Sequence, residues 1–236
     1  MKEKIVLITG GTRGLGRALS INYGKNGYYV YSTFSNDFNA ADNLKREFKN
    51  FNIDGVCVQA DVTKSDTSYD IDTKDEIIII NNACASLYPQ PMHLLKWNDY
   101  ELHINTSIKG SYILIQNLLK KLIKIKKVCI VNILSETIYE PIPKGFSHYI
   151  TAKYALQGFT KSLSSELYHY GIKCFSISPG FMETSLTKNW PDLMKETIKN
   201  NQKKILSTEE ISKKIFNITN DSSIPGRGED YKINDI

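Results

Sequence analysis

The stretch Ile5-Val6-Leu7-Ile8-Thr9-Gly10-Gly11-Thr12-Arg13-Gly14-Leu15-Gly16 joins an apolar, strand-like run to a glycine loop, and a helical pattern follows it at residues 17–23. A strand, a glycine loop and a helix in this order are typical of a dinucleotide-binding unit, although the spacing here is GxxxGxG rather than GxGxxG. Glycines allow a tight turn and let the backbone approach a pyrophosphate, whose charge suits a helix N-terminus. The alternative is a glycine turn that only joins strand to helix.

Short β-rich runs alternate with helical patterns along the rest of the chain. The expected strands are residues 5–9, 28–34, 55–60, 76–81, 127–133, 173–178 and 231–236. Strands that alternate with helices indicate a parallel sheet with helices on both faces. We therefore predict an α/β fold: one Rossmann-type, doubly wound domain over residues 1–236 with a seven-stranded parallel sheet. Residues 62–75 are polar and offer few apolar anchors, so we expect a short or broken helix there.

Composition excludes several classes of protein. The 236 residues are 41% hydrophobic, which is enough for one sizeable core, and the net charge of +5 comes from dispersed lysines. That charge is mild evidence for an acidic partner and none for nucleic acid. No apolar run reaches the length of a signal peptide or a membrane span, so we expect a cytoplasmic protein with no membrane partner. The four cysteines have no CxxC spacing, and we expect neither a metal site nor disulfides.

The choice of cofactor depends on the residues just after the second strand. An acid at its end would bind a ribose 2′-hydroxyl, but the strand ends at Thr33-Phe34 without one, and Asp37 is better placed to begin the next helix. Arg13 could instead bind a 2′-phosphate, with help from the hydroxyl of Thr33 or Ser35. The sequence therefore favours NADP(H) over NAD(H). The alternative role for Arg13 is a solvated surface charge.

Four polar residues form a candidate catalytic group. Tyr149 and Lys153 lie four positions apart in a helical pattern and share one face, although this spacing also arises by chance. Ser135 follows a predicted strand, and Asn105 precedes a helical pattern. Taken singly, Ser135 could be a turn or cap residue and Asn105 a helix cap. Their order along the chain, behind the glycine loop, favours a shared function.

With Asp61, Asn81-Asn82-Ala83 and Pro179-Gly180 added, the chain resembles the short-chain dehydrogenase/reductase family, most closely its 3-oxoacyl-[acyl-carrier-protein] reductases. The resemblance implies that Tyr149 donates a proton to a substrate carbonyl and that Lys153 lowers the tyrosine pKa and binds the nicotinamide ribose. It also implies that Ser135 hydrogen-bonds the carbonyl oxygen and that Asn105 fixes a water.

The resemblance also implies a set of cofactor contacts, with Asp61 at the adenine amino group and Thr184 at the carboxamide. The set is Gly10, Thr12, Arg13, Gly14, Leu15, Gly16, Asp61, Val62, Asn82, Ala83, Tyr149, Lys153, Pro179, Gly180 and Thr184. Cys84 departs from the family, which has glycine there, and would be costly if its φ were positive. A substrate lid is expected at about 181–206, with Met182, Leu186, Trp190 and Met194 as apolar candidates.

The resulting hypothesis is an NADP(H)-dependent oxidoreductase that reduces a carbonyl to a secondary alcohol, on a small ketone or a 3-oxoacyl thioester. The alternative is a cofactor-binding sensor or subunit with little catalysis, motivated by Cys84 and the short crossover. Lysines 120, 121, 124, 126 and 127 could dock an acyl-carrier protein, or only keep a helix end soluble. They lack the interleaved aromatics of a nucleic-acid site. Family tetramers pair two long helices, here 106–124 and 149–170, so a homo-tetramer or dimer is expected.

Overall fold

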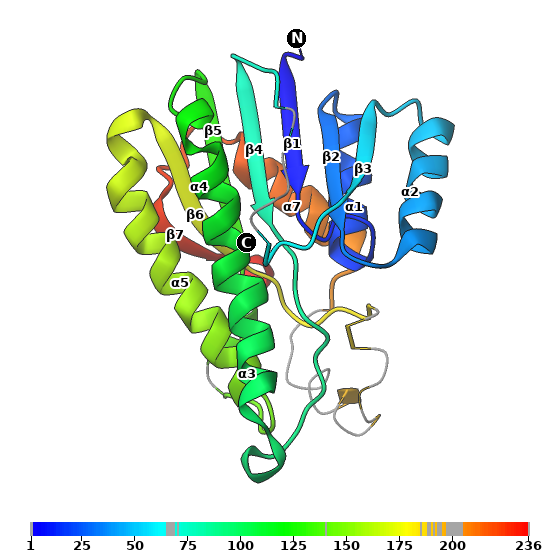
Figure 1. Ribbon diagram of the computed structural model, residues 1–236, viewed down its shortest axis with the longest axis vertical. Coiled ribbons are helices and arrows are strands. Elements are labelled where there is room, and N and C mark those ends of the chain that lie inside the picture. The colour runs from blue at the N-terminus through cyan, green and yellow to red at the C-terminus, as the bar shows by residue number, and fades with distance from the viewer. Residues whose placement is uncertain are drawn as a thin grey trace.

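The computed structural model describes residues 2–64, 69, 71–139, 141–184, 186–187, 190, 192, 195–196 and 205–235. Seven strands form one parallel sheet in the order β3-β2-β1-β4-β5-β6-β7 (Figure 1). The strands are β1 (Lys4–Ile8), β2 (Tyr29–Phe34), β3 (Gly55–Gln59), β4 (Glu76–Asn81), β5 (Lys127–Ile133), β6 (Ile172–Ser178) and β7 (Arg227–Lys232). All neighbouring pairs are parallel, which confirms the doubly wound α/β prediction.

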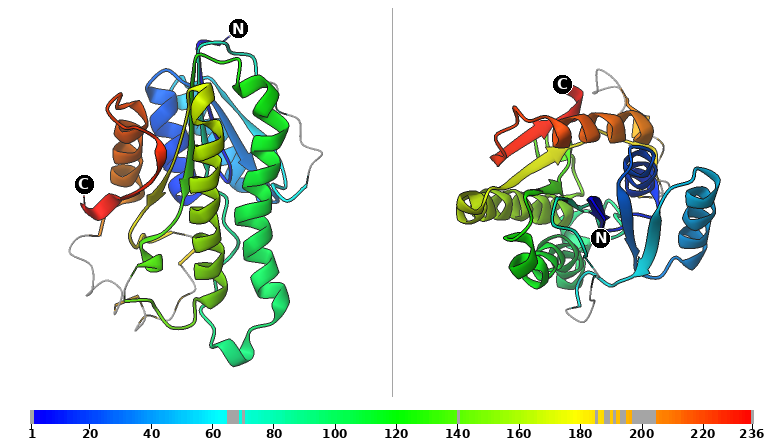
Figure 2. Two further views of the ribbon diagram at one scale, coloured as in Figure 1. Left: turned by 90° about the vertical axis from the view of Figure 1, so that its left-hand side faces the viewer. Right: turned by 90° about the horizontal axis from the view of Figure 1, so that it is seen from above.

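Helices cover both faces of the sheet (Figure 2). On one face lie α1 (Gly14–Lys25), α2 (Phe38–Asn50) and α7 (Thr208–Asn220), and on the other α4 (Gly110–Leu122) and α5 (Ser147–Leu167). Side chains of a strand point alternately to the two faces, so Val6 and Ile8 pack against the first layer while Ile5 and Leu7 pack against the second. Burial on both faces explains why the inner strands are continuous apolar runs.

A long helical run extends beyond the sheet. Helix α3 (Trp97–Ile104) continues through a π-helical turn, Asn105–Lys109, into α4. Together with the first half of α5, α3 extends past the carboxyl ends of the strands (Figure 1). At that edge β1 is paired with both β2 and β4, so the connections after neighbouring strands diverge. Such a switch point is where open α/β sheets bind ligands.

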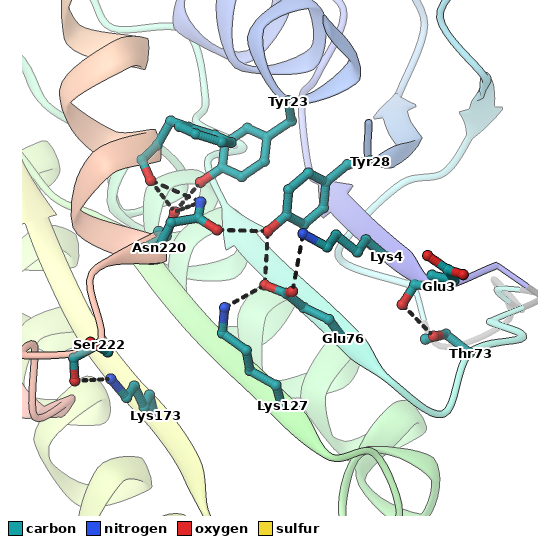
Figure 3. A network of polar contacts seen from close by, with 12 residues as sticks. Glu3, Lys4, Tyr23, Tyr28, Thr73, Glu76, Lys127, Lys173, Asn220 and Ser222 are labelled. Atoms are coloured by element: carbon teal, nitrogen blue, oxygen red, sulfur yellow. Dashed lines mark hydrogen bonds and ion pairs between the residues drawn. The ribbon is translucent and has the colours of Figure 1, made fainter. Parts of the chain in front are cut away.

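At the opposite, amino edge of the sheet, where the strands begin, lies the buried carboxylate of Glu76 (Figure 3). It accepts a hydrogen bond from the Tyr28 hydroxyl at 2.8 Å and pairs with Lys127 Nζ at 2.8 Å and Lys4 Nζ at 4.0 Å. The Tyr28 hydroxyl also lies 2.9 Å from Oδ1 of Asn220, at the end of α7. The network stabilises the fold at the edge away from the glycine loop, because a buried charge needs partners.

The last strand differs from the prediction of residues 231–236. Strand β7 ends at Lys232, and Ile233–Asp235 form a 3-10 turn. The sequence of β7 is polar because the strand lies at the edge of the sheet and bonds to β6 through side chains as well as through the backbone. The Asp230 carboxylate accepts hydrogen bonds from the hydroxyls of Ser176 and Ser178, both at 2.7 Å. The sequence pattern therefore predicted a last strand but placed both of its ends four residues too late.

The predicted short or broken helix over residues 62–75 is only partly covered by the structure. Described residues of the segment 62–75 are not helical, and residues 65–68 and 70 lie outside the description. The carboxylate of Asp61 accepts from the Thr63 amide at 3.0 Å and from its hydroxyl at 2.8 Å. Such a local turn competes with helix formation. Tyr69 and Ile71 anchor the crossover in the core beside α4.

Candidate active site

One large pocket opens at the carboxyl ends of the strands, with a volume of about 1490 Å³, enough for a dinucleotide and a substrate. All fifteen predicted cofactor residues line it: Gly10, Thr12, Arg13, Gly14, Leu15, Gly16, Asp61, Val62, Asn82, Ala83, Tyr149, Lys153, Pro179, Gly180 and Thr184. Ser135 lines it as well, whereas Asn105 does not; its neighbour Thr106 does. The structure thus brings together residues that were chosen from six separate parts of the sequence.

The glycine loop has the backbone that a pyrophosphate site requires. Gly10 and Gly14 have φ angles of +62° and +49°, which favour glycine. A Cβ added at Gly16 would lie 2.1 Å from the Gly10 carbonyl oxygen, so only glycine fits there. Helix α1 begins at Gly14 and has no acidic residue in its first turn. The loop therefore presents a helix N-terminus that is free of opposing charge, as an anion site needs.

Thr9 fixes the glycine loop, although the sequence analysis gave it no role. Its hydroxyl accepts hydrogen bonds from the Asn82 and Ala83 amides, both at 3.0 Å. The side-chain amide of Asn82 donates in return to the carbonyls of Thr9 at 3.0 Å and Gly10 at 3.1 Å. These bonds lock the end of β4 to the end of β1 at the switch point. Asn82 therefore shapes the cradle through its side chain and can face a ligand only through its backbone.

Arg13 and Asp37 form an ion pair at the adenosine end of the pocket. Nη1 of Arg13 lies 3.2 Å from Oδ2 of Asp37, whose Oδ1 accepts from the Ala40 amide at 3.0 Å and caps α2. The prediction that Asp37 begins the helix is confirmed, but Asp37 also lines the pocket. Arg13 is not simply a solvated charge. Of the two candidate hydroxyls, that of Thr33 accepts from the Gly10 amide at 3.3 Å, and Ser35 is exposed.

The catalytic candidates converge from β5 and α5. Ser135 follows the end of β5, and Tyr149 and Lys153 lie one helical turn apart on α5. The Lys153 ammonium donates to the Ile133 carbonyl at 2.7 Å and lies 5.5 Å from the centre of the Tyr149 ring. Ser135 is also a cap, since its oxygen accepts from the Thr137 amide and hydroxyl at 3.3 and 2.9 Å. Ser135 therefore caps the 3-10 turn that follows it and also lines the pocket beside the other catalytic candidates.

Burial dominates the protonation of this group. It raises the pKa of the Tyr149 hydroxyl, an effect that the Ser135 side chain only partly offsets, and it lowers the pKa of Lys153. The described side chains thus move the Tyr149 pKa away from neutrality, opposite to the direction that we expected from Lys153. The largest cause of the raised Tyr149 pKa is burial of the hydroxyl, and the electrostatic effect of Cys84 acts in the same direction.

Asn105 lies inside a helical run, so the alternative of a helix cap is wrong. Its φ and ψ of −62° and −42° are helical, and it begins the π turn that joins α3 to α4. Turns of this kind interrupt the regular bonding of a helix and are frequent at functional sites. The turn places Thr106 on the pocket wall.

The substrate end of the pocket is apolar. Its wall includes Leu87, Leu134, Phe181, Leu186 and Trp190. The Trp190 indole donates to the Leu87 carbonyl at 3.0 Å and packs edge-on against Phe146, with ring centroids 5.0 Å apart. The predicted lid residues Met182, Leu186 and Trp190 are therefore pocket-lining, while Met194 lies outside the described residues. Residues 141–143 also line the pocket.

Cys84 fits its position without strain. Among the described non-glycine residues only Asn52 has a positive φ, so Cys84 does not bear the energetic cost of a left-handed backbone. Its thiol lines the pocket, and burial raises its pKa, which disfavours the reactive thiolate. All four cysteines are free, and Cys57, Cys129 and Cys174 are buried as expected.

Two buried histidines behind Tyr149 escaped the sequence analysis, because no motif marks them. His103 on α3 and His148 on α5 are 2% and 3% exposed, and their ring centroids are 4.8 Å apart. The ring of His103 is also 5.8 Å from that of Tyr149. Burial lowers the pKa of His103 to about 4 and also lowers that of His148. Both rings are therefore neutral near neutral pH.

The lysine cluster, residues 120, 121, 124, 126 and 127, lies at the edge of the sheet away from the pocket, a position that does not favour docking of an acyl-carrier protein at the pocket. It surrounds the end of α4 and the start of β5, whereas the pocket opens after Ile133, at the other end of β5. A seven-residue strand spans about 23 Å. Two of the lysines are also paired, Lys126 with Asp75 and Lys127 with Glu76. These residues therefore serve the amino edge of the sheet. No helix within the described part of the chain is long and apolar enough to cross a membrane.

Known proteins with similar sequences and structures agree with this geometry. The family model for short chain dehydrogenase matches residues 4–195. The 3-oxoacyl-[acyl-carrier-protein] reductase FabG of Staphylococcus epidermidis is 26% identical over 203 residues, 82% of this chain and 81% of the relative. That of Pseudomonas aeruginosa is 26% identical over 207 residues, 84% of this chain and 81% of the relative.

Two solved structures extend the comparison. ElxO with NADP bound superposes with a TM-score of 0.81 at 26% identity, covering 99% of this chain and 97% of that one. A 3-oxoacyl-[acyl-carrier protein] reductase with bound NAD from Brucella melitensis gives 0.81 at 23% identity, covering 98% and 89%. At that identity the second likeness concerns the fold alone. The pocket, its glycine loop and these matches show that the chain is an NAD(P)-dependent oxidoreductase and belongs to the short chain dehydrogenase family.

Proposed function

We propose that this enzyme uses NADP(H) to reduce the carbonyl of a small ketone or 3-oxoacyl thioester to a secondary alcohol, with Tyr149 as the proton donor. The observation that carries the proposal is that Ser135, Tyr149 and Lys153 line the same pocket as the glycine loop. A bound nicotinamide cofactor would supply the hydride. The roles of the chain's own residues are to bind, orient and move one proton.

Each catalytic residue has a role that its contacts support. Ser135 and Tyr149 both line the pocket, so both hydroxyls can donate to one carbonyl oxygen there. The Lys153 ammonium is held by the Ile133 carbonyl, close to the Tyr149 ring. Its remaining protons are available for the ribose hydroxyls and for resupply of the tyrosine proton. Asn105, at the π turn, is proposed to hold a water on that route.

The apolar wall supports a nonpolar or acyl substrate. Phe181, Trp190 and Leu134 are buried and line the pocket, so a charged group placed against them would lose hydration. The relatives named as 3-oxoacyl-[acyl-carrier-protein] reductases make a carrier-bound thioester a reasonable test substrate. We propose that the lid at about 181–206 covers this end within a single domain of residues 1–236.

An oligomer of two or four copies is part of the proposal. Trp97 and Leu102 on α3, Tyr112 on α4 and Tyr154 on α5 are large and at least 45% exposed. Tyr112 and Tyr154 lie on the two long helices that we expected to pair, and Trp97 and Leu102 lie on α3, which precedes the first of them. Apolar patches of this kind mark interfaces. Light scattering coupled to size exclusion would measure the mass directly. The cytoplasmic location and the absence of a nucleic-acid partner stay predictions.

The test is NADPH oxidation with acetoacetyl thioesters, compared with NADH and with the variant Tyr149→Phe. Turnover should fall at least about a hundredfold in the variant, the size of a general-acid contribution. Tyr170→Phe is the matched control, because Tyr170 is half-exposed and lies outside the pocket lining. Equal activity of Tyr149→Phe and the wild type would contradict the mechanism. Tight NADPH binding without turnover on a wide panel of ketones would favour the sensor or subunit function.

A further inference from the structure

The ion pair between Arg13 and Asp37 offers two ligand groups of opposite charge at one place. Both residues line the pocket at the end of β2, beside Ser35 and Asn36. Arginine suits a 2′-phosphate because its planar fork donates two bonds, whereas a carboxylate suits a ribose 2′-hydroxyl. The two cofactors NADPH and NADH differ only at this position. Whichever cofactor enters, one of the two side chains is suited to it and the other is not.

The pair is weak enough to open. The Arg13 side chain is 57% exposed and that of Asp37 is 37% exposed, with a single contact of 3.2 Å. Exposed pairs with one contact contribute little to stability, because water screens them and both side chains lose freedom. Neighbouring Arg17 differs, since it makes two bonds to Glu47 and is less exposed. Arg13 can therefore exchange its partner at small cost, while Arg17 stays bound.

Asp37 has a second bond that keeps it in place when the pair opens. Its Oδ1 accepts from the Ala40 amide at 3.0 Å and caps α2, while Oδ2 faces Arg13. The carboxylate is thus fixed at the pocket wall whether or not Arg13 is bound to it. There it competes for the arginine that would bind a 2′-phosphate.

We propose that Asp37 sets the cofactor preference of this enzyme by competing for Arg13, so that the protein accepts NADH as well as NADPH and discriminates between them only weakly. The inference deepens the proposed function, on whose nicotinamide cofactor it rests. Arg13 turns from Asp37 to the 2′-phosphate when NADPH binds. Asp37 accepts a bond from the 2′-hydroxyl when NADH binds, and Arg13 then remains paired. The preference for NADP(H) that Arg13 alone would give is therefore reduced.

The test is the binding of NADP⁺ and NAD⁺, measured by calorimetry on the full chain without substrate. Asp37→Asn keeps the helix cap, because asparagine is as good a cap as aspartate, and removes the charge. The ratio of the NAD⁺ to the NADP⁺ dissociation constant should rise about tenfold or more, with tighter NADP⁺ binding and weaker NAD⁺ binding. Arg13→Gln should move the ratio the other way. In the Arg13→Gln background, Asp37→Asn should change NADP⁺ binding by less than about threefold.

Three results would overturn the inference. In the first, Asp37→Asn leaves the ratio unchanged, which would make Asp37 a helix cap only. In the second, the effect of Asp37→Asn on NADP⁺ is the same with and without Arg13, so that the two residues act separately. In the third, the wild type binds neither nucleotide, which would also contradict the proposed function. Nucleotide binding that responds as described, without ketone reduction, would uphold the inference and contradict only the proposed activity.

Discussion

Acid should destabilise this protein through His103, which is buried behind the catalytic tyrosine. The ring is 2% exposed, and burial, with smaller contributions from His148 and Lys153, lowers its pKa from 6.5 to about 4. The unfolded chain regains the ordinary value, so it binds more protons than the folded chain between these two values. Stability is therefore full above about pH 6.5 and is lost as the pH falls toward about 4.

The size of the effect follows from the two pKa values. Below both of them the loss amounts to about 3 kcal/mol, and between about pH 7 and about pH 5 it amounts to about 2 kcal/mol. A chain of this size loses about 2–4 °C of melting temperature per kcal/mol, so this interval should cost about 4–8 °C. The pKa of His148 is also lowered by burial, which adds to the loss in the same direction.

The assay is urea unfolding of the wild type and His103→Leu at about pH 7 and about pH 5, with the free energy of unfolding compared within each protein. The variant should lose about 2 kcal/mol less than the wild type over this interval, whatever its stability at neutral pH. His93→Leu is the matched control, because His93 is exposed on a short 3-10 turn, Met92–Leu94. Parallel pH dependences for the wild type and His103→Leu would refute the reasoning.

Three further changes test other parts of the structure. Gly16→Ala should weaken nucleotide binding at least about tenfold, because the new Cβ would lie 2.1 Å from a backbone oxygen, whereas Gly158→Ala, with open space around it, should bind normally in the same titration. Glu76→Gln should lower the free energy of urea unfolding by about 1–3 kcal/mol and leave kcat unchanged, since its network lies at the amino edge. Trp190→Phe removes the bond to the Leu87 carbonyl, and the KM for an apolar ketone should rise about threefold to tenfold in steady-state kinetics, with a smaller change in kcat.

The inner strands of the sheet were predictable because they are buried on both faces. A run such as Ile77–Ile80 has no polar position, and the expected bounds of β4 and β5 agree with the structure. Strand β7 was not predictable in the same way. It lies at the edge, and its bonds run from Asp230 to hydroxyls of β6, so its residues are polar.

The buried face of α4 was only partly predicted. The helical spacing of Ile108, Tyr112, Ile115 and Leu119 in the sequence favours these four as one buried face, but Tyr112 is 48% exposed and the buried apolar set is Leu114, Ile115, Leu118 and Leu122. The π turn at Asn105–Lys109 holds more residues per turn than an α-helix, so it offsets Ile108 from the face of α4 that follows. Sequence periodicity alone does not reveal such a turn.

Some residues of the candidate site are close in the sequence, whereas others meet only because of the topology of the sheet. Tyr149 and Lys153 share one helix face, so their spacing in the sequence carried the signal. Arg13 and Asp37 were both noticed, but they were given separate roles because they are 24 positions apart. Strands β1 and β2 are parallel neighbours, and the loops after parallel neighbours begin at the same edge of the sheet. The predicted topology therefore already implied that these two loops meet, and a prediction of cofactor preference should weigh the arginine of one loop against the carboxylate of the other.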